Sequence, residues 1–111
     1  MQHRYSEFVD RLFVSRSEGL EGLVHASMGL AGESGEVLDM IKKVWANDRG
    51  LDAVKMREEL GDVLFYFTAL CNILDLSLDD VIETNMAKLN KRYPNGYSHA
   101  ASLARADVDA A

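Results

Sequence analysis

The chain has 111 residues, 48% of them apolar, and a formal net charge of −6. This length predicts one small folded domain, and the negative charge argues against binding of polymeric nucleic acid, which requires a basic face. Nucleotide chemistry stays open, because bound metal ions reverse the sign of the electrostatic field at an acidic site.

The single cysteine, Cys71, excludes an internal disulfide and favours a reducing compartment. It lies in an apolar run, which indicates a buried small side chain rather than a nucleophile. No apolar stretch reaches the roughly 20 residues that a membrane-spanning helix needs. The charged N-terminus has no signal-peptide pattern. We therefore expect a cytoplasmic protein without a membrane partner.

The first half of the chain predicts two helices. One runs from about residue 2 to 16, because its apolar side chains recur with helical spacing, and residues 17–22 follow as a linker. The next runs from about residue 20 to 45. It contains Gly29, Gly32 and Gly35, each of which costs roughly 1 kcal/mol against alanine inside a helix. Such glycines indicate a close approach, either of a packed helix, which is the simpler interpretation, or of a ligand.

A third helix is expected from about residue 52 to 74, after a turn at 47–50, with Asp52 as its N-terminal cap. Apolar residues cover most of its circumference, which is typical of a helix buried on all sides. In so short a chain, this burial requires a partner surface. We therefore expect the third helix to lie in a subunit interface.

The fourth helix begins at the capping pattern Ser77-Leu78-Asp79-Asp80 and ends at about Arg92, before Pro94. Residues 100–105 have the composition of one or two further helical turns, and residues 107–111 are expected to be frayed. The fold prediction is all-α: a four-helix bundle protomer forming a single domain over residues 1–97. Residues 98–111 form a partly disordered C-terminal tail.

Two carboxylate pairs are the main functional signal. Glu33 and Glu36 are three residues apart in the second helix, and Glu59 and Asp62 repeat this spacing in the third. Residues at this spacing share one helix face, and here both faces also carry apolar residues. A single inward glutamate is more often paired with a lysine or arginine. Several buried carboxylates together repel one another, so two such pairs favour a metal site.

The ligand chemistry indicates a hard cation. Carboxylate oxygens suit Mg²⁺, or Mn²⁺ as its substitute, rather than zinc. A di-iron bundle would carry Glu-x-x-His motifs, and none of His3, His25 and His99 stands in one. Magnesium normally shares its coordination with substrate phosphates.

Basic and amide side chains offer partners for those phosphates. Asn85, Lys88 and Arg92 lie within one arc of the fourth helix, together with apolar residues, so we expect this arc to face inward. Lys42 and Lys43 follow Glu36 by one to two turns. For each of these residues the alternative is a solvated side chain or a salt bridge.

The segments LAGESGEVLDMIKK, REELGDVLFYFTAL and NMAKLNKRYPNGY resemble the MazG-like all-α nucleoside triphosphate pyrophosphohydrolases. The resemblance extends from about Leu23 to Tyr97. It implies Mg²⁺-dependent hydrolysis of an NTP or dNTP to the monophosphate and pyrophosphate. It also implies homodimers, or tetramers built from dimers, with sites near the subunit interfaces.

Residue by residue, the resemblance implies that the four carboxylates are catalytic metal ligands and that one of them, or Glu58, orients the attacking water. Tyr66 becomes a candidate contact to the sugar or base, and His25 and Trp45 become candidates for the base pocket, with core packing as the alternative for all three. Two other functions stay open. One is a phosphoribosyl-ATP pyrophosphohydrolase, and the other is a non-catalytic nucleotide- or metal-binding protein.

Overall fold

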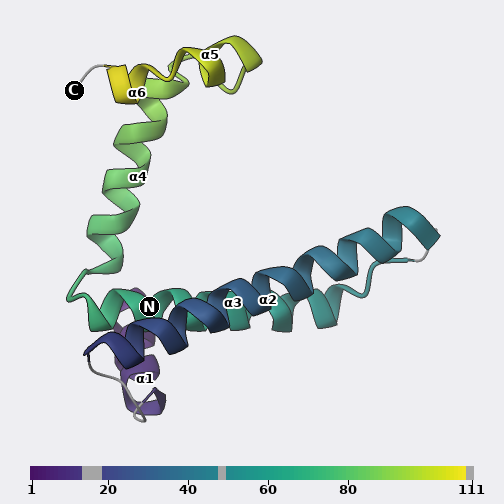
Figure 1. Ribbon diagram of the computed structural model, residues 1–111, viewed down its shortest axis with the longest axis vertical. Helices are drawn as coiled ribbons and strands as arrows, with labels where there is room; N and C mark the ends of the chain where they lie inside the picture. The colour runs from purple at the N-terminus through teal and green to yellow at the C-terminus, as the bar shows by residue number, and fades with distance from the viewer. Residues whose placement is uncertain (14–18, 48–49, 110–111) are drawn as a thin grey trace. The chain divides into compact units, whose positions relative to one another are not determined.

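The computed structural model describes residues 1–13, 19–47 and 50–109. These residues form helices and no strand, which confirms the all-α prediction (Figure 1). The helices are α1 (Gln2–Leu12), α2 (Gly19–Asn47), α3 (Ala53–Ile73), α4 (Leu78–Arg92), α5 (His99–Ala104) and α6 (Ala106–Asp109). Three short segments lie outside the described residues: 14–18, 48–49 and 110–111. They contain the predicted end of the first helix and start of the linker, part of the predicted turn, and the last two residues of the expected frayed end.

The chain divides into two compact units, residues 1–76 and 77–111. The first contains α1 to α3 and the second α4 to α6. The division falls before α4, whereas the sequence predicted one domain up to residue 97. The four-helix bundle and its domain boundary therefore stay predictions.

In the first unit, α2 and α3 lie side by side over most of their length, and α1 packs against α3 (Figure 1). The buried hydrophobic cluster is small and contains Val9, Phe13, Ala26 and Ala69, with partly buried aromatic and aliphatic side chains around it. The Asn72 side-chain amide also donates a hydrogen bond to the Ser6 carbonyl at 3.0 Å, which ties α3 to α1.

The helix starts follow the predicted caps. The backbone N–H of Lys55 donates to Asp52 Oδ1 at 3.1 Å, and the N–H of Asp80 donates to Ser77 Oγ at 3.0 Å. Each carboxylate or hydroxyl thus satisfies one of the N–H groups that a helix start leaves without a partner. The two predicted caps are confirmed.

Gly29 accounts for the close approach of α2 to α3. A Cβ atom at this position would lie 2.6 Å from Tyr66 Cζ and closer still to two other ring carbons, so only glycine lets the Tyr66 ring lie against α2. Gly32 and Gly35 differ, because an added Cβ at either would meet nothing within 4 Å. Close helix packing is therefore confirmed for Gly29. Among the described residues of the single chain, no helix packs closely against Gly32 or Gly35.

Large apolar side chains stay exposed on the first unit. On α2 these include Leu38, 66% exposed, and Trp45, 86% exposed. On α3, Leu60 and Leu64 are about half exposed, so a single chain does not bury this helix on all sides as the sequence predicted. The subunit interface that would complete its burial stays a prediction.

In the second unit, α5 and α6 follow the loop after Pro94 and pack against α4 (Figure 1). The Ala101 N–H donates to Ser98 Oγ at 3.0 Å and caps α5. Residues 107–109, part of the segment expected to be frayed, belong to α6. Asp107 makes an ion pair with Arg92 of α4. The expected fraying stays a prediction.

Among the described residues, no single helix has both the length and the apolar character needed to cross a membrane. The consecutive helices α3 and α4 meet that test only when they are taken together as a bent pair.

Candidate metal centre

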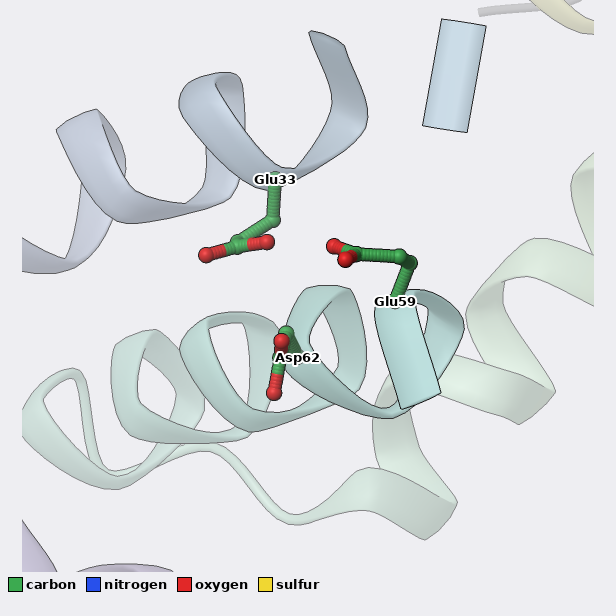
Figure 2. A group of neighbouring side chains, drawn as sticks. All are labelled: Glu33, Glu59 and Asp62. Atoms are coloured by element: carbon green, nitrogen blue, oxygen red, sulfur yellow. The ribbon is translucent and has the colours of Figure 1, made fainter. Parts of the chain in front are cut away.

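Three carboxylates meet between α2 and α3. Glu33 comes from α2, and Glu59 and Asp62 come from successive turns of α3. One oxygen atom from each lies within 4.8 Å of the others. Figure 2 shows the Glu33 side chain extending from α2 toward the two α3 side chains. This separation is short enough for a single cation to contact all three carboxylates.

Burial and mutual repulsion act on this cluster. Partial burial raises the pKa of Glu33, and a hydrogen bond with Glu59 and the charges of Asp62, Glu59 and Glu36 raise it further. Two carboxyl groups can share a hydrogen bond only when one of them holds a proton. The surroundings of Glu33 in the folded chain thus hold its pKa above the usual value for a glutamate.

The donor set fits a hard divalent cation. All three groups offer carboxylate oxygens, which are the ligands that Mg²⁺ and Mn²⁺ prefer. A cation between the three groups would offset the repulsion among their negative charges. Asp62 is exposed, so solvent or substrate can reach the cluster from its side.

The structure does not bring Glu36 or Glu58 into this group. Both side chains are exposed. Glu36 lies nearly one turn beyond Glu33 on α2, and its charge still contributes to the raised pKa of Glu33. In the single chain, Glu33 and Glu59 are partly buried, whereas Glu36 and Asp62 are exposed. That both pairs face inward stays a prediction. This face of the α2–α3 pair is open among the described residues.

Tyr66 and His25 lie beyond the cluster, toward the α2 start. The Tyr66 ring centroid is 5.2 Å from that of Phe65 and 6.2 Å from that of His25, so the core-packing alternative describes its present contacts. His25 is exposed, and its ring centroid lies 4.8 Å from that of Phe13. An open cavity of about 700 Å³ is lined by Leu20, Glu21, Val24, His25, Met28 and Gly29.

Trp45 lies far from this cavity. It is twenty residues after His25 on the same helix, which corresponds to about 30 Å at 1.5 Å per residue. The two side chains predicted to line one base pocket are therefore not brought together within a single chain. Lys42 is also exposed on this part of α2, whereas Lys43 pairs with Asp39 at 2.8 Å.

The predicted phosphate-binding arc belongs to α4. Asn85 and Lys88 are exposed in the single chain, and the inward orientation expected for them stays a prediction. Arg92 is partly buried because it pairs with Asp107. The expectation that this arc lies opposite the acidic cluster is not tested, since the two belong to different units.

Two residues near the predicted groups were missed. Tyr5 of α1 has a raised pKa, chiefly through burial and also through the negative charge of Asp62, so it lies near the cluster. Its sequence context showed only a place on an apolar face. Asp107 lies fifteen residues after Arg92, in a segment expected to be frayed. In both cases a tertiary contact makes the connection, and no spacing in the sequence indicates it.

The comparisons with known proteins identify the family of this chain. The family model described as MazG nucleotide pyrophosphohydrolase domain matches residues 25–97, a range that contains all three clustered carboxylates. The chain is also 37% identical over 83 residues to the Gene 37 protein of Mycobacterium phage L5. The aligned region covers 71% of this chain and 73% of that protein. No solved structure matches. Since this family model matches well over half of the chain, the chain belongs to the MazG nucleotide pyrophosphohydrolase family.

Proposed function

We propose that this protein is a Mg²⁺-dependent nucleoside triphosphate pyrophosphohydrolase that converts an NTP or dNTP and water to the (d)NMP and pyrophosphate. The observation that carries the proposal is the meeting of Glu33, Glu59 and Asp62 from two helices. The family supports hydrolysis of a nucleotide to pyrophosphate, and the donor chemistry supports the choice of cation.

The three clustered carboxylates would hold the cation, and Glu36, nearly one turn along α2, is the candidate fourth ligand. Bound Mg²⁺ would supply positive charge next to the substrate phosphates and lower the pKa of a coordinated water. Mn²⁺ has similar ligand preferences and is the expected substitute.

In the proposed reaction, a water oxygen attacks one of the two phosphorus atoms joined by the α–β bridging oxygen, and the bond from that phosphorus to the bridging oxygen breaks. The bridging oxygen leaves with the bonding electron pair, and the products are the (d)NMP and pyrophosphate. A carboxylate oxygen of the cluster, or of Glu58, accepts a hydrogen bond from the water and orients it. The raised pKa of Glu33 reflects burial and the negative charges around it, and a bound cation would offset that repulsion.

The remaining predicted residues would bind the nucleotide. Asn85, Lys88 and Arg92 offer donors for the phosphates, as does Lys42. Tyr66 and His25 are the candidates for the sugar and base, supported by the open cavity beside His25. Trp45 would reach the same nucleotide only from another subunit, because it lies about 30 Å along α2 from His25.

Exposed apolar residues of α2 and α3 support a homodimer or a tetramer built from dimers as the working form. Light scattering measures the molar mass of the protein in solution and so tests this assembly. A monomer at micromolar concentration would contradict it. We also propose a cytoplasmic location, which follows from the free cysteine and the nucleotide substrate.

The test is product identity. The protein is incubated with each NTP and dNTP and Mg²⁺, and the products are separated. The proposal expects a monophosphate and pyrophosphate, whereas a diphosphate and orthophosphate would contradict cleavage between the α- and β-phosphates. Turnover of phosphoribosyl-ATP alone would indicate the biosynthetic reaction, and binding without any product would indicate a non-catalytic protein.

Variants test the site. Glu59→Gln keeps the size of the side chain and removes one charge from the cluster, so we expect it to lose turnover. Glu83→Gln is the matched control, because it removes the same charge from an exposed position on α4. Equal activity of the two variants would remove Glu59 from the site.

A further inference from the structure

The Arg92 guanidinium is already held by a carboxylate of the same chain. Its Nε donates to Asp107 Oδ1 at 2.6 Å, and its Nη2 donates to Oδ2 at 3.1 Å. The two side chains are only 19% and 6% exposed. Two parallel charge-assisted hydrogen bonds make this a bidentate pair, the strongest arrangement that arginine forms with an anion.

The Asp107 carboxylate occupies the edge of the Arg92 guanidinium at which another anion can bind. The Nε–Nη2 edge of a guanidinium receives two phosphate oxygens in the same way as it receives two carboxylate oxygens. Lys88 lies one turn before Arg92 on α4, and both positive charges lower the pKa of Asp107, with the hydrogen bonds from Arg92 as the largest cause. Asp107 therefore lies near Lys88 and Arg92, the two cationic side chains that the sequence predicts as phosphate-binding residues.

The segment that carries Asp107 has little support of its own. The helix α6 has four residues, too few for a helix to be stable in isolation. It follows Arg105, whose φ of 50° is in the left-handed region that side chains other than glycine seldom adopt. Val108 is about half exposed. The position of α6 thus depends largely on its contact with α4, and a competing anion at Arg92 would release it.

We propose that Asp107 is an internal competitor for the phosphate that binds at Arg92, so that α6 is a latch that an incoming phosphate chain displaces. The proposal rests on the proposed function, in which Arg92 binds substrate phosphate. While Asp107 occupies the guanidinium, only the fraction of molecules with an open latch is competent to bind, and the apparent affinity for phosphate falls by that fraction.

The test uses inorganic pyrophosphate as the probe, without metal, so that the acidic cluster takes no part. The Nε–H resonance of Arg92 reports binding in the full chain. Asp107→Asn keeps the shape and removes the competing charge, and we expect its dissociation constant for pyrophosphate to fall by roughly five- to thirty-fold, the effect of losing one strong intramolecular partner. Glu83→Gln controls for net charge, and Arg92→Gln should abolish the gain when it is combined with Asp107→Asn.

Equal or weaker binding to Asp107→Asn than to the unchanged chain would overturn the latch. A second measurement needs no variant: in the unchanged chain, the Val108 amide resonance should shift together with that of Arg92 during the titration. Movement of Arg92 alone would mean that phosphate binds without displacing α6, which also overturns it. If the chain hydrolyses no nucleotide, these titrations still decide the latch. If hydrolysis is retained and they fail, only the latch is lost.

Discussion

Replacing Gly29 with alanine tests how the carboxylate cluster is built. The contact between Gly29 and the Tyr66 ring lies one helical turn from Glu33 on α2 and one turn from Asp62 on α3. It therefore fixes the separation of the two helices beside the cluster. An alanine Cβ would lie 2.6 Å from Tyr66 Cζ, where ordinary contact begins at 3.4 Å, and nearer still to two other ring carbons. The ring or the helix must move by about 1 Å to accommodate it.

Two effects oppose each other in this variant. Alanine favours the helix over glycine by about 1 kcal/mol. Overpacking of a well-packed site costs about 1 to 3 kcal/mol, and the Tyr66 ring cannot simply swing away because Phe65 and His25 lie against it. We expect Gly29→Ala to lose about 1 kcal/mol of unfolding free energy and to bind Mg²⁺ more weakly than the unchanged chain, since Glu33 moves with α2.

Gly32→Ala and Gly35→Ala are the matched controls. An added Cβ meets nothing within 4 Å at either position, so each should gain about 1 kcal/mol from helix propensity alone. Urea unfolding followed by circular dichroism measures all three variants. Gly29→Ala as stable as Gly32→Ala would refute the packing argument. A destabilised Gly32→Ala or Gly35→Ala would place a second subunit on that face of α2.

Three further predictions concern the cluster and the helix starts. Mg²⁺ at about a hundred times its dissociation constant should add about 2.7 kcal/mol of stability, and the resulting rise in Tm of about 10 °C should disappear in Glu59→Gln; an equal rise in that variant would contradict the site. The raised pKa of Glu33 means that the folded chain binds more protons than the unfolded one between the ordinary carboxyl pKa and the folded value. Metal-free stability should therefore fall as pH rises through that interval and stay low above it, and Glu33→Gln should lack this component in urea unfolding at several pH values. Asp52→Ala should lose about 1 kcal/mol through loss of its cap to Lys55, while an exposed Asp79→Ala serves as the comparison.

The sequence was informative where the physics is local. Apolar spacing located the helices, and the caps at Asp52 and Ser77 follow from side chains that accept hydrogen bonds from N–H groups three residues along the chain. The gathering of Glu33, Glu59 and Asp62 was also predictable, because carboxylates on apolar faces of two consecutive helices meet once those helices pack against each other. Helical periodicity states which residues share a face and leaves open what lies opposite that face.

The tertiary contacts that the sequence did not predict have a common cause: helical periodicity does not state what lies opposite a face. Glu36 shares an arc with Glu33, yet α3 offers no carboxylate opposite it within the cluster. His25 and Trp45 were chosen for chemistry alone, and the length of an unbroken helix separates them. The pairing of Arg92 with Asp107 depends on α6 folding back against α4, which no spacing in the sequence encodes.

The net charge of −6 bears on the proposed triphosphate substrate through the cluster. Three carboxylates whose oxygens lie within 4.8 Å of one another repel a polyanion. A triphosphate that arrives without a cation therefore meets an unfavourable field at the cluster, and Mg²⁺ changes its sign. Because magnesium keeps part of its coordination for phosphate oxygens, the exposed side at Asp62 is where a metal–nucleotide complex can enter as one unit. This electrostatic argument predicts that nucleotide affinity at the cluster depends on Mg²⁺ before any bond is broken, and calorimetry with a non-hydrolysable nucleotide, with and without the cation, measures it.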